Sequence, residues 1–157
     1  YFTRGSGHNE QAAYSEKPQD YVANVDRLRR KLDTARTLVP KPDFEDAPGA
    51  TTGLLAFGTS RYGTLEARDK LSRDFGIPVD YCLLKALPIG EELRAWVARH
   101  DRVLVVEQNR DGQLRTILCD EMPEHATKLG SIRQYNGHPL DATTVIDGVL
   151  HDRQRKG

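Results

Sequence analysis

Cysteine, net charge and long apolar runs are all scarce in this chain. Its 157 residues include only two cysteines, Cys82 and Cys119, and neither belongs to a Cys-x-x-Cys pair. An iron–sulfur cluster takes about four cysteine ligands, so these two could not hold one. The 23 basic and 23 acidic residues cancel, which gives no sign of a nucleic-acid or anionic-membrane surface. No run approaches the roughly 18 apolar residues of a membrane span, and lone cysteines suit a reducing cytoplasm.

Familiar cofactor and catalytic motifs are missing as well. There is no Gly-x-Gly-x-x-Gly fingerprint, and the glycine-bearing turn at 58–64 lacks the lysine of a phosphate loop. We interpret this turn as a strand-to-helix junction with Thr59 or Ser60 as N-cap; the alternative is an anion or a partner carboxylate on the helix N-terminus. The five histidines are scattered, and no Ser–His–acid or Cys–His arrangement can be assembled. We therefore expect no metal site, no bound cofactor and no catalytic residue in this chain.

The first 50 residues read as an arm, a helix and a spacer. Residues 1–17 are polar and carry little apolar surface, and Pro18 suits the first turn of a helix. Apolar residues then recur at steps of three and four, which predicts one long amphipathic helix over 18–39. The spacer at 40–50 contains three prolines and a glycine. The members of the helical stripe are Tyr21, Val25, Leu28, Leu32, Ala35 and Leu38.

Beyond residue 50, short apolar runs alternate with helical segments. The runs predict strands at 52–57, 79–84, 102–107 and 131–135. Helices are expected from the turn at 58–60 to about Phe75, and over 91–99, 112–119 and 140–150. Such alternation is typical of a parallel sheet that helices cover on both faces. We predict a three-layer α/β/α domain over 51–150 with four to five mostly parallel strands, followed by a tail at 151–157.

The strongest candidate site is the polar loop that ends the run at 102–107. In open α/β sheets, ligands and partners meet the domain at the carboxyl ends of the strands. Asn109 or Asp111 could also serve simply as the cap of the following helix, which would not exclude a contact role. Because an unpaired buried carboxylate is costly, Glu107 should face the crevice and accept a hydrogen bond or pair with Arg61 or Arg110. The predicted contact residues here are Glu107, Gln108, Asn109, Arg110 and Asp111.

The opening segment, at 1–10, is the second candidate site. It begins with Tyr rather than Met and has no signal-peptide pattern, so we interpret it as the start of a C-terminal piece of a larger polypeptide. Its glycines let the backbone approach another surface closely. We predict contacts with a neighbour through Arg4, Gly5, His8 and Asn9, the alternative being a flexible cut end.

Two segments carry a family resemblance. Tyr1-Phe2-Thr3-Arg4-Gly5-Ser6-Gly7-His8-Asn9-Glu10 and Val105-Val106-Glu107-Gln108-Asn109-Arg110-Asp111-Gly112-Gln113-Leu114 resemble the C-terminal part of the alpha subunit of 2-oxoacid:ferredoxin oxidoreductases, above all those of the 2-oxoglutarate type. The resemblance covers essentially the whole chain and is weakest at 43–50 and 151–157. It implies a transketolase C-terminal-like fold in which one edge strand is allowed to be antiparallel.

The same resemblance implies a structural and subunit-contact role. The whole enzyme would decarboxylate a 2-oxoacid oxidatively, make an acyl-coenzyme A and pass electrons to ferredoxin. Thiamine diphosphate, magnesium and the iron–sulfur cluster would lie elsewhere in that complex. The partners of this chain would be the remainder of the alpha subunit and the beta subunit, with a homodimer of the chain as a further option.

Two other classes of protein remain open. A stand-alone α/β module of flavodoxin-like shape would bind a small ligand through the turns at 58–60 and 107–113. The C-terminal domains of transketolase and of 2-oxoacid dehydrogenases share the expected fold, but they should lack the opening at 4–10.

Overall fold

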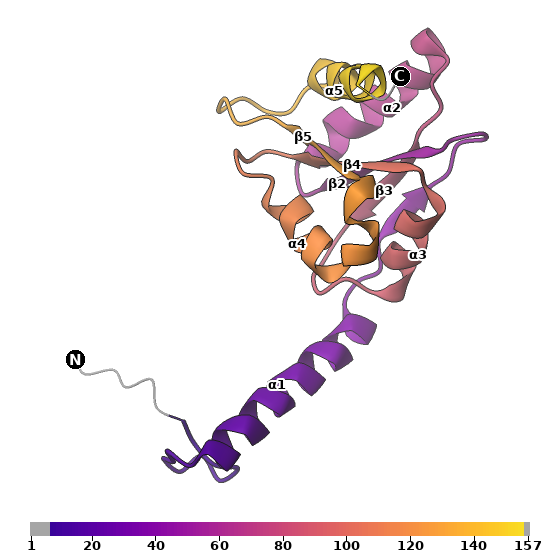
Figure 1. The fold of residues 1–157 in the computed structure, drawn as a ribbon. Coiled ribbons are helices and arrows are strands. Elements are labelled where there is room, and N and C mark those ends of the chain that lie inside the picture. The colour runs from indigo at the N-terminus through magenta and orange to yellow at the C-terminus, as the bar shows by residue number, and fades with distance from the viewer. Residues whose placement is uncertain (1–6, 156–157) are drawn as a thin grey trace. The chain divides into compact units, whose positions relative to one another are not determined.

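The computed structural model describes residues 7–155 and divides into two compact units, Tyr1–Val39 and Pro40–Gly157. Arg4 and Gly5, two of the predicted contact residues, lie outside the described residues. The second unit contains the sheet and the helices that cover it (Figure 1).

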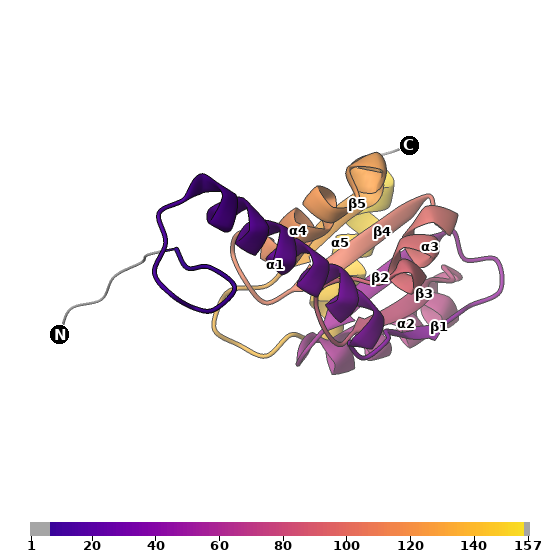
Figure 2. The ribbon, with the colours of Figure 1, turned by 90° about the horizontal axis from the view of Figure 1, so that it is seen from below.

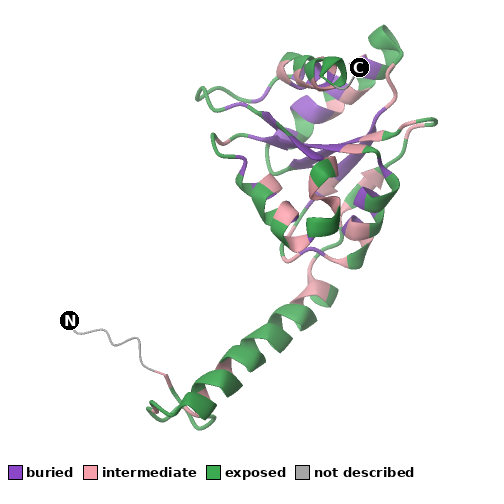
Figure 3. Cartoon of the chain, viewed as in Figure 1, coloured by how far each residue is buried: buried purple, intermediate pink, exposed green. Residues whose placement is uncertain are grey.

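In the first unit, a tight loop precedes helix α1 (Pro18–Leu38). The predicted long helix is confirmed: a proline stands in its first turn and its last turn ends before Pro40. Its apolar stripe buries no residue, and most of the helix is exposed (Figure 3). Helices in proteins gain most of their stability from packing an apolar face, and the stripe of α1 is such a face.

The second unit is built on a five-stranded sheet of order β1-β3-β2-β4-β5. Its strands are β1 (Asp43–Glu45), β2 (Thr52–Phe57), β3 (Asp80–Leu84), β4 (Arg102–Glu107) and β5 (Leu129–Arg133). All neighbouring pairs are parallel except β1 and β3, which are antiparallel. The predicted three-layer α/β/α fold with a mostly parallel sheet is therefore confirmed, and β1 and β5 form its two edges (Figure 2).

Helices cover both faces of this sheet. Helices α2 (Ser60–Phe75) and α5 (Ala142–Gln154) pack on one face; α3 (Glu91–Arg99), α4 (Gln113–Glu121) and the short 3-10 helix η1 (Pro123–Lys128) lie on the other (Figure 1). Along β4, Leu104 and Val106 enter the first layer of core, whereas Val103 and Val105 enter the second. Central strands buried on both faces explain why the sequence reads as continuous apolar runs rather than as alternation.

The structure corrects two predicted elements in the sheet. The fourth predicted strand, at 131–135, is in fact Leu129–Arg133. Gly130 obscured the start of this strand, because glycine is a weak strand former. A larger residue would clash at this position, since its Cβ would lie 2.4 Å from the Arg102 guanidinium. The spacer at 40–50 contains β1, whose only apolar residue, Phe44, stacks on Trp96 at 5.8 Å. Three residues with one apolar side chain give too little pattern to predict a strand.

Helix ends also differ from the prediction. Helix α4 runs one residue later at its start and two residues further at its end than the expected 112–119. The closing helix begins at Ala142 and continues to Gln154, so most of the predicted tail at 151–157 is helical. Asp141 accepts a hydrogen bond from the Thr144 backbone N–H at 2.7 Å and so fixes the start of α5.

Candidate functional site

The carboxyl edge of the sheet opens between β2 and β4. Helix α2 leaves β2 toward one face and α4 leaves β4 toward the other, which makes this the switch point where α/β sheets commonly bind ligands. A pocket of about 490 Å³ lies there, lined by the ends of β2, β3 and β4 and by α4. Its walls are mainly apolar, and Phe57, Leu87 and Ile117 are each more than a third exposed.

Glu107 lies at the base of this edge with 0% of its surface exposed. Its carboxylate accepts hydrogen bonds from the backbone N–H groups of Leu114, at 2.8 Å, and Arg115, at 3.0 Å. The Asn109 side-chain amide donates a third, at 2.8 Å. A buried negative charge is thus compensated by the N-terminus of α4, where helix N–H groups favour an anion. Of the two predicted alternatives, a hydrogen bond or a pairing with Arg61 or Arg110, the structure confirms the hydrogen bond.

Asn109 closes the loop from within. Its Oδ1 accepts hydrogen bonds from the backbone N–H groups of Gly112, at 2.7 Å, and Gln113, at 3.2 Å. Gly112 has φ of 63°, a left-handed conformation that glycine adopts without steric cost. With Glu107, Asn109 satisfies the first N–H groups of α4, so the capping interpretation holds for Asn109 and not for Asp111.

The other three loop residues face solvent. Gln108 donates from Nε2 to the Thr59 hydroxyl at 3.1 Å, which joins the two loops of the switch point. Arg110 forms an exposed ion pair with Asp111 at 2.7 Å, and this hydrogen bond raises the pKa of Arg110. Gln108, Arg110 and Asp111 are therefore free of the core and suited to an external contact, which stays a prediction.

The turn at 58–60 is held by serine rather than by a side-chain cap. Thr59 occupies the N-cap position of α2 without a capping hydrogen bond. Ser60 instead donates to the Phe57 carbonyl oxygen at 2.5 Å. Thr59 therefore stands at the predicted N-cap position, but its hydroxyl accepts a hydrogen bond from Gln108 instead of capping the helix.

The described part of the arm is ordered around Asn9. Its Oδ1 accepts hydrogen bonds from the backbone N–H groups of Gln11, at 3.1 Å, and Ala13, at 3.0 Å. His8 pairs with Tyr14 in an isolated antiparallel bridge, and its carbonyl accepts a hydrogen bond from Asn24 of α1. The His8 side chain remains exposed. Asn9 shapes the loop and leaves His8 as the contact candidate.

A buried aspartate–histidine pair lies at the opposite, amino edge of the sheet. His100, at the C-terminus of α3, contacts the Asp80 carboxylate through Nε2 at 3.0 Å and the Trp96 carbonyl through Nδ1 at 2.7 Å. Both ring nitrogens thus contact groups of the protein, and neither is free to meet a ligand. Asp80 also accepts from the Ala47 backbone N–H at 2.7 Å. The pair ties β3, α3 and the segment after β1 together.

Reactive groups and metal ligands are sparse among residues 7–155. Burial raises the pKa of the Cys82 thiol, which makes it a poor nucleophile. Within the described range, no three His, Cys, Asp or Glu side chains are grouped as metal ligands. The helices that the structure describes include none long and apolar enough to cross a membrane.

Sequence reasoning missed a second hollow, of about 430 Å³, beside the edge strand β5. Its lining residues are spread over 102–155 and come from β4, α4, η1, β5 and α5. The one local signal was the alternation at 131–133, where Ser131 and Arg133 are exposed and Ile132 is buried.

Comparison with solved structures places the fold. No protein-family model matches the chain. A 2-oxoglutarate:ferredoxin oxidoreductase from Magnetococcus marinus, solved with 2-oxoglutarate, coenzyme A and succinyl-CoA bound, matches 97% of this chain at a TM-score of 0.75 and 20% identity. A split-gene transketolase, an inactive beta4 tetramer, matches 69% of the chain and 40% of its own length at a TM-score of 0.56 and 20% identity.

These likenesses confirm the transketolase C-terminal-like fold. This chain spans only 26% of the length of the oxidoreductase chain. The alpha chain of a probable 2-oxoacid ferredoxin oxidoreductase from Thermoplasma acidophilum also matches, with 19% identity over 71% of this chain and 96% of that one, but its TM-score of 0.42 is too low to support the fold.

Proposed function

We propose that this chain is a C-terminal structural and subunit-contact domain of the alpha subunit of a 2-oxoacid:ferredoxin oxidoreductase, with 2-oxoglutarate as the 2-oxoacid. One observation carries the proposal: the oxidoreductase match covers 97% of the chain. The unit Pro40–Gly157 makes up only about three quarters of it, so that match takes in most of the arm and α1. The transketolase match covers 69% of the chain, a share that the unit Pro40–Gly157 could supply without the arm or α1.

In this proposal the chemistry belongs to the whole complex. Other parts of the complex hold thiamine diphosphate, magnesium and the iron–sulfur cluster. The sites for coenzyme A and ferredoxin also lie in those parts. The chain contributes packing surfaces for the remainder of the alpha subunit and for the beta subunit. Its exposed candidates are His8 of the arm, the apolar stripe of α1, and Gln108, Arg110 and Asp111 at the carboxyl edge.

The two halves of the 107–111 loop have separate tasks in this proposal. Glu107 and Asn109 bond to the backbone of α4 and hold the loop in shape. Gln108, Arg110 and Asp111 project from it without supporting the core. A contact role predicts that the exposed residues matter for assembly and that the buried ones matter for stability.

The first experiment compares the native assembly with the chain alone. The chromosomal gene would be tagged, the complex isolated, and reduction of a low-potential viologen dye measured with 2-oxoglutarate and coenzyme A. We expect coenzyme A-dependent turnover by the native isolate and none by the purified 157-residue chain. Turnover by the chain alone, or an isolate inactive with 2-oxoglutarate and other 2-oxoacids, would contradict the proposal.

A paired measurement then separates contact from scaffold. His8→Ala and Arg110→Ala should leave the melting temperature of the isolated chain within about 2 °C, since exposed substitutions usually cost under about 0.5 kcal/mol. The same changes in the native complex should weaken assembly or lower turnover. If the complex keeps full activity and composition with both changes, these residues make no essential contact.

The pocket at the switch point favours a second candidate, a stand-alone module that binds a small ligand. Its volume of about 490 Å³ falls in the usual range for ligand sites. Nucleotides, coenzyme A and thiamine diphosphate would each be titrated against the isolated chain while its melting temperature is followed. A saturable rise that Ile117→Glu abolishes would favour this candidate; no rise with any of them would favour the contact domain.

A further inference from the structure

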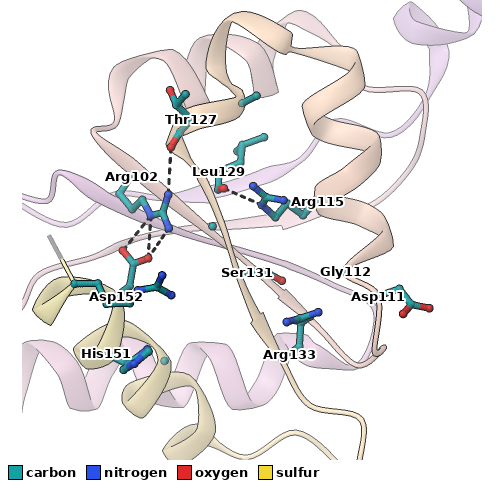
Figure 4. A pocket seen from close by; sticks show the side chains of 14 residues that line it. Arg102, Asp111, Gly112, Arg115, Thr127, Leu129, Ser131, Arg133, His151 and Asp152 are labelled. Carbon is teal, nitrogen blue, oxygen red and sulfur yellow. Dashed lines mark hydrogen bonds and ion pairs between the residues drawn. The ribbon is translucent and has the colours of Figure 1, made fainter.

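The hollow beside β5 has the shape of a groove along an open sheet edge. β5 forms its floor, α4 contributes one wall and α5 the other, and η1 closes one end (Figure 4). Arg115 and Ser131 lie on the α4 side of the strand, and His151 and Asp152 lie on the α5 side. A strand added to a sheet lies about 4.8 Å from its neighbour, so it would run between these two helices.

The floor presents unpaired backbone groups. The Gln134 N–H donates to the Glu107 carbonyl of β4 at 3.0 Å. In a parallel ladder the residues that bond a given neighbour alternate, so Leu129, Ser131 and Arg133 direct their N–H and C=O groups outward. The Leu129 carbonyl accepts from Arg115 Nε at 2.8 Å. No described residue bonds the backbone N–H of Ser131 or Arg133, and these are the groups that a further strand would use.

The walls carry an excess of positive charge. Arg102 is neutralised by Asp152, which its Nε contacts at 3.0 Å, and Asp111 is paired with Arg110. Arg115, Arg133 and Arg155 also line the groove, and no described carboxylate forms an ion pair with any of them. Arg115 and Arg133 are each fixed by one hydrogen bond to a backbone carbonyl, at 2.8 and 2.7 Å. Their remaining N–H groups suit carboxylate oxygens.

The two edges of the sheet differ in this respect. The opposite edge is β1, three residues long, with acids at both ends. Short, charged edge strands are a common protection against unwanted pairing. β5 has five residues and lies at the bottom of a basic hollow, so its charges would repel another basic strand but attract an acidic one.

We propose that this groove binds an extended, acidic polypeptide segment of a partner, which adds a sixth strand to the sheet beside β5. The segment would exchange backbone hydrogen bonds with Ser131 and with the Arg133 N–H. Its acidic side chains would alternate between Arg115 and Arg133 on one side and His151 and Arg155 on the other. The inference rests on residues of the α/β unit alone and does not depend on the proposed oxidoreductase role.

The test uses a labelled eight-residue peptide of paired glutamates and paired threonines, which places glutamates on both faces of the extended chain and is longer than β5. Binding to the 157-residue chain would be followed by fluorescence anisotropy. A second peptide would carry N-methyl groups on alternate backbone nitrogens, which removes the donors for strand pairing but keeps every charge. We expect saturable binding of the first peptide and affinity about tenfold lower for the second, because at least two hydrogen bonds are lost.

Three variants locate the site. Arg133→Glu reverses a charge in the groove, and Ser131→Pro removes an outward N–H without removing a bond to β4; each should weaken binding about tenfold or more. Arg153→Glu makes the same charge change on α5 outside the groove and should alter affinity less than twofold. Bound peptide should also slow amide exchange at Ser131 and Arg133, a readout that holds even if the proline variant fails to fold.

Several results would overturn the inference. Equal affinity for the N-methylated peptide, or displacement of the first peptide by inorganic phosphate alone, would reduce the groove to an anion site without strand addition. Absence of saturable binding would show that the groove does not bind such a segment. An equal loss of affinity with Arg153→Glu would show that the peptide does not bind in the groove. A chain that dimerises in solution and becomes monomeric with Ser131→Pro would make the occupant a second copy instead of an acidic partner.

Discussion

Replacing Glu107 with alanine should be among the most destabilising single changes in the α/β unit. The change deletes a fully buried carboxylate and with it the acceptor of three hydrogen bonds, from Leu114, Arg115 and Asn109. The Leu114 N–H, which is buried, is left without a partner. Hydrogen bonds to charged groups contribute about 1.5–3 kcal/mol each, and a stranded buried donor costs about 1–3 kcal/mol. We expect a net loss of about 3 kcal/mol in the free energy of unfolding.

Calorimetric melting of the isolated chain measures this loss. For a domain of this size, 1 kcal/mol corresponds to about 4 °C, so Glu107→Ala should lower the melting temperature by about 12 °C. Glu107→Gln keeps the shape and one acceptor oxygen and should cost about half as much. Gln108→Ala is the matched control, since Gln108 is exposed and makes one hydrogen bond to Thr59; it should shift melting by about 2 °C or less.

The outcome separates a cap from a contact. If Glu107→Ala melts within about 2 °C of the unchanged chain, the carboxylate does not hold α4 and the reasoning fails. If that stable variant also loses assembly with its partners, the residue acts at an interface, as the family resemblance had suggested. A large loss of stability in the isolated chain instead assigns Glu107 to the scaffold.

Three further outcomes are expected. Val105→Asp should unfold the α/β unit, because Val105 is fully buried at the centre of the sheet and a charge there is uncompensated; a soluble variant with unchanged melting would contradict this. The Cys82 thiol should resist thiol reagents in the native chain and react on unfolding, because burial raises its pKa; fast native labelling mapped to Cys82 would show that the site opens. The Thr144 backbone N–H lowers the pKa of Asp141 below its ordinary 3.8, so its contribution is present above that value and is lost as pH falls through the lower folded pKa; Asp141→Ala should show less acid destabilisation in this range than the unchanged chain, and an identical pH profile would refute the link.

The 107–111 loop shows how much of the candidate site could be predicted from the sequence. Five polar residues after an apolar strand correctly marked the carboxyl edge of β4. The pattern could not divide them into buried and exposed members. That division depends on the N-terminus of α4, which lies over Glu107 once the chain has turned at Gly112, and on the Thr59 hydroxyl, which comes from a loop 49 residues earlier.

The sequence by itself determined the class of fold, because strands buried on both faces must be apolar throughout and helices that cover a sheet must carry one apolar face. Only the tertiary structure decided the strand order, the pairing of β1 and the groove beside β5. These depend on contacts between residues far apart in the chain: Phe44 with Trp96 places β1, and Arg102 with Gly130 and Asp152 fixes the end of β5 against α5. Periodicity reports which face of an element is buried, but it carries no information about which element lies against that face.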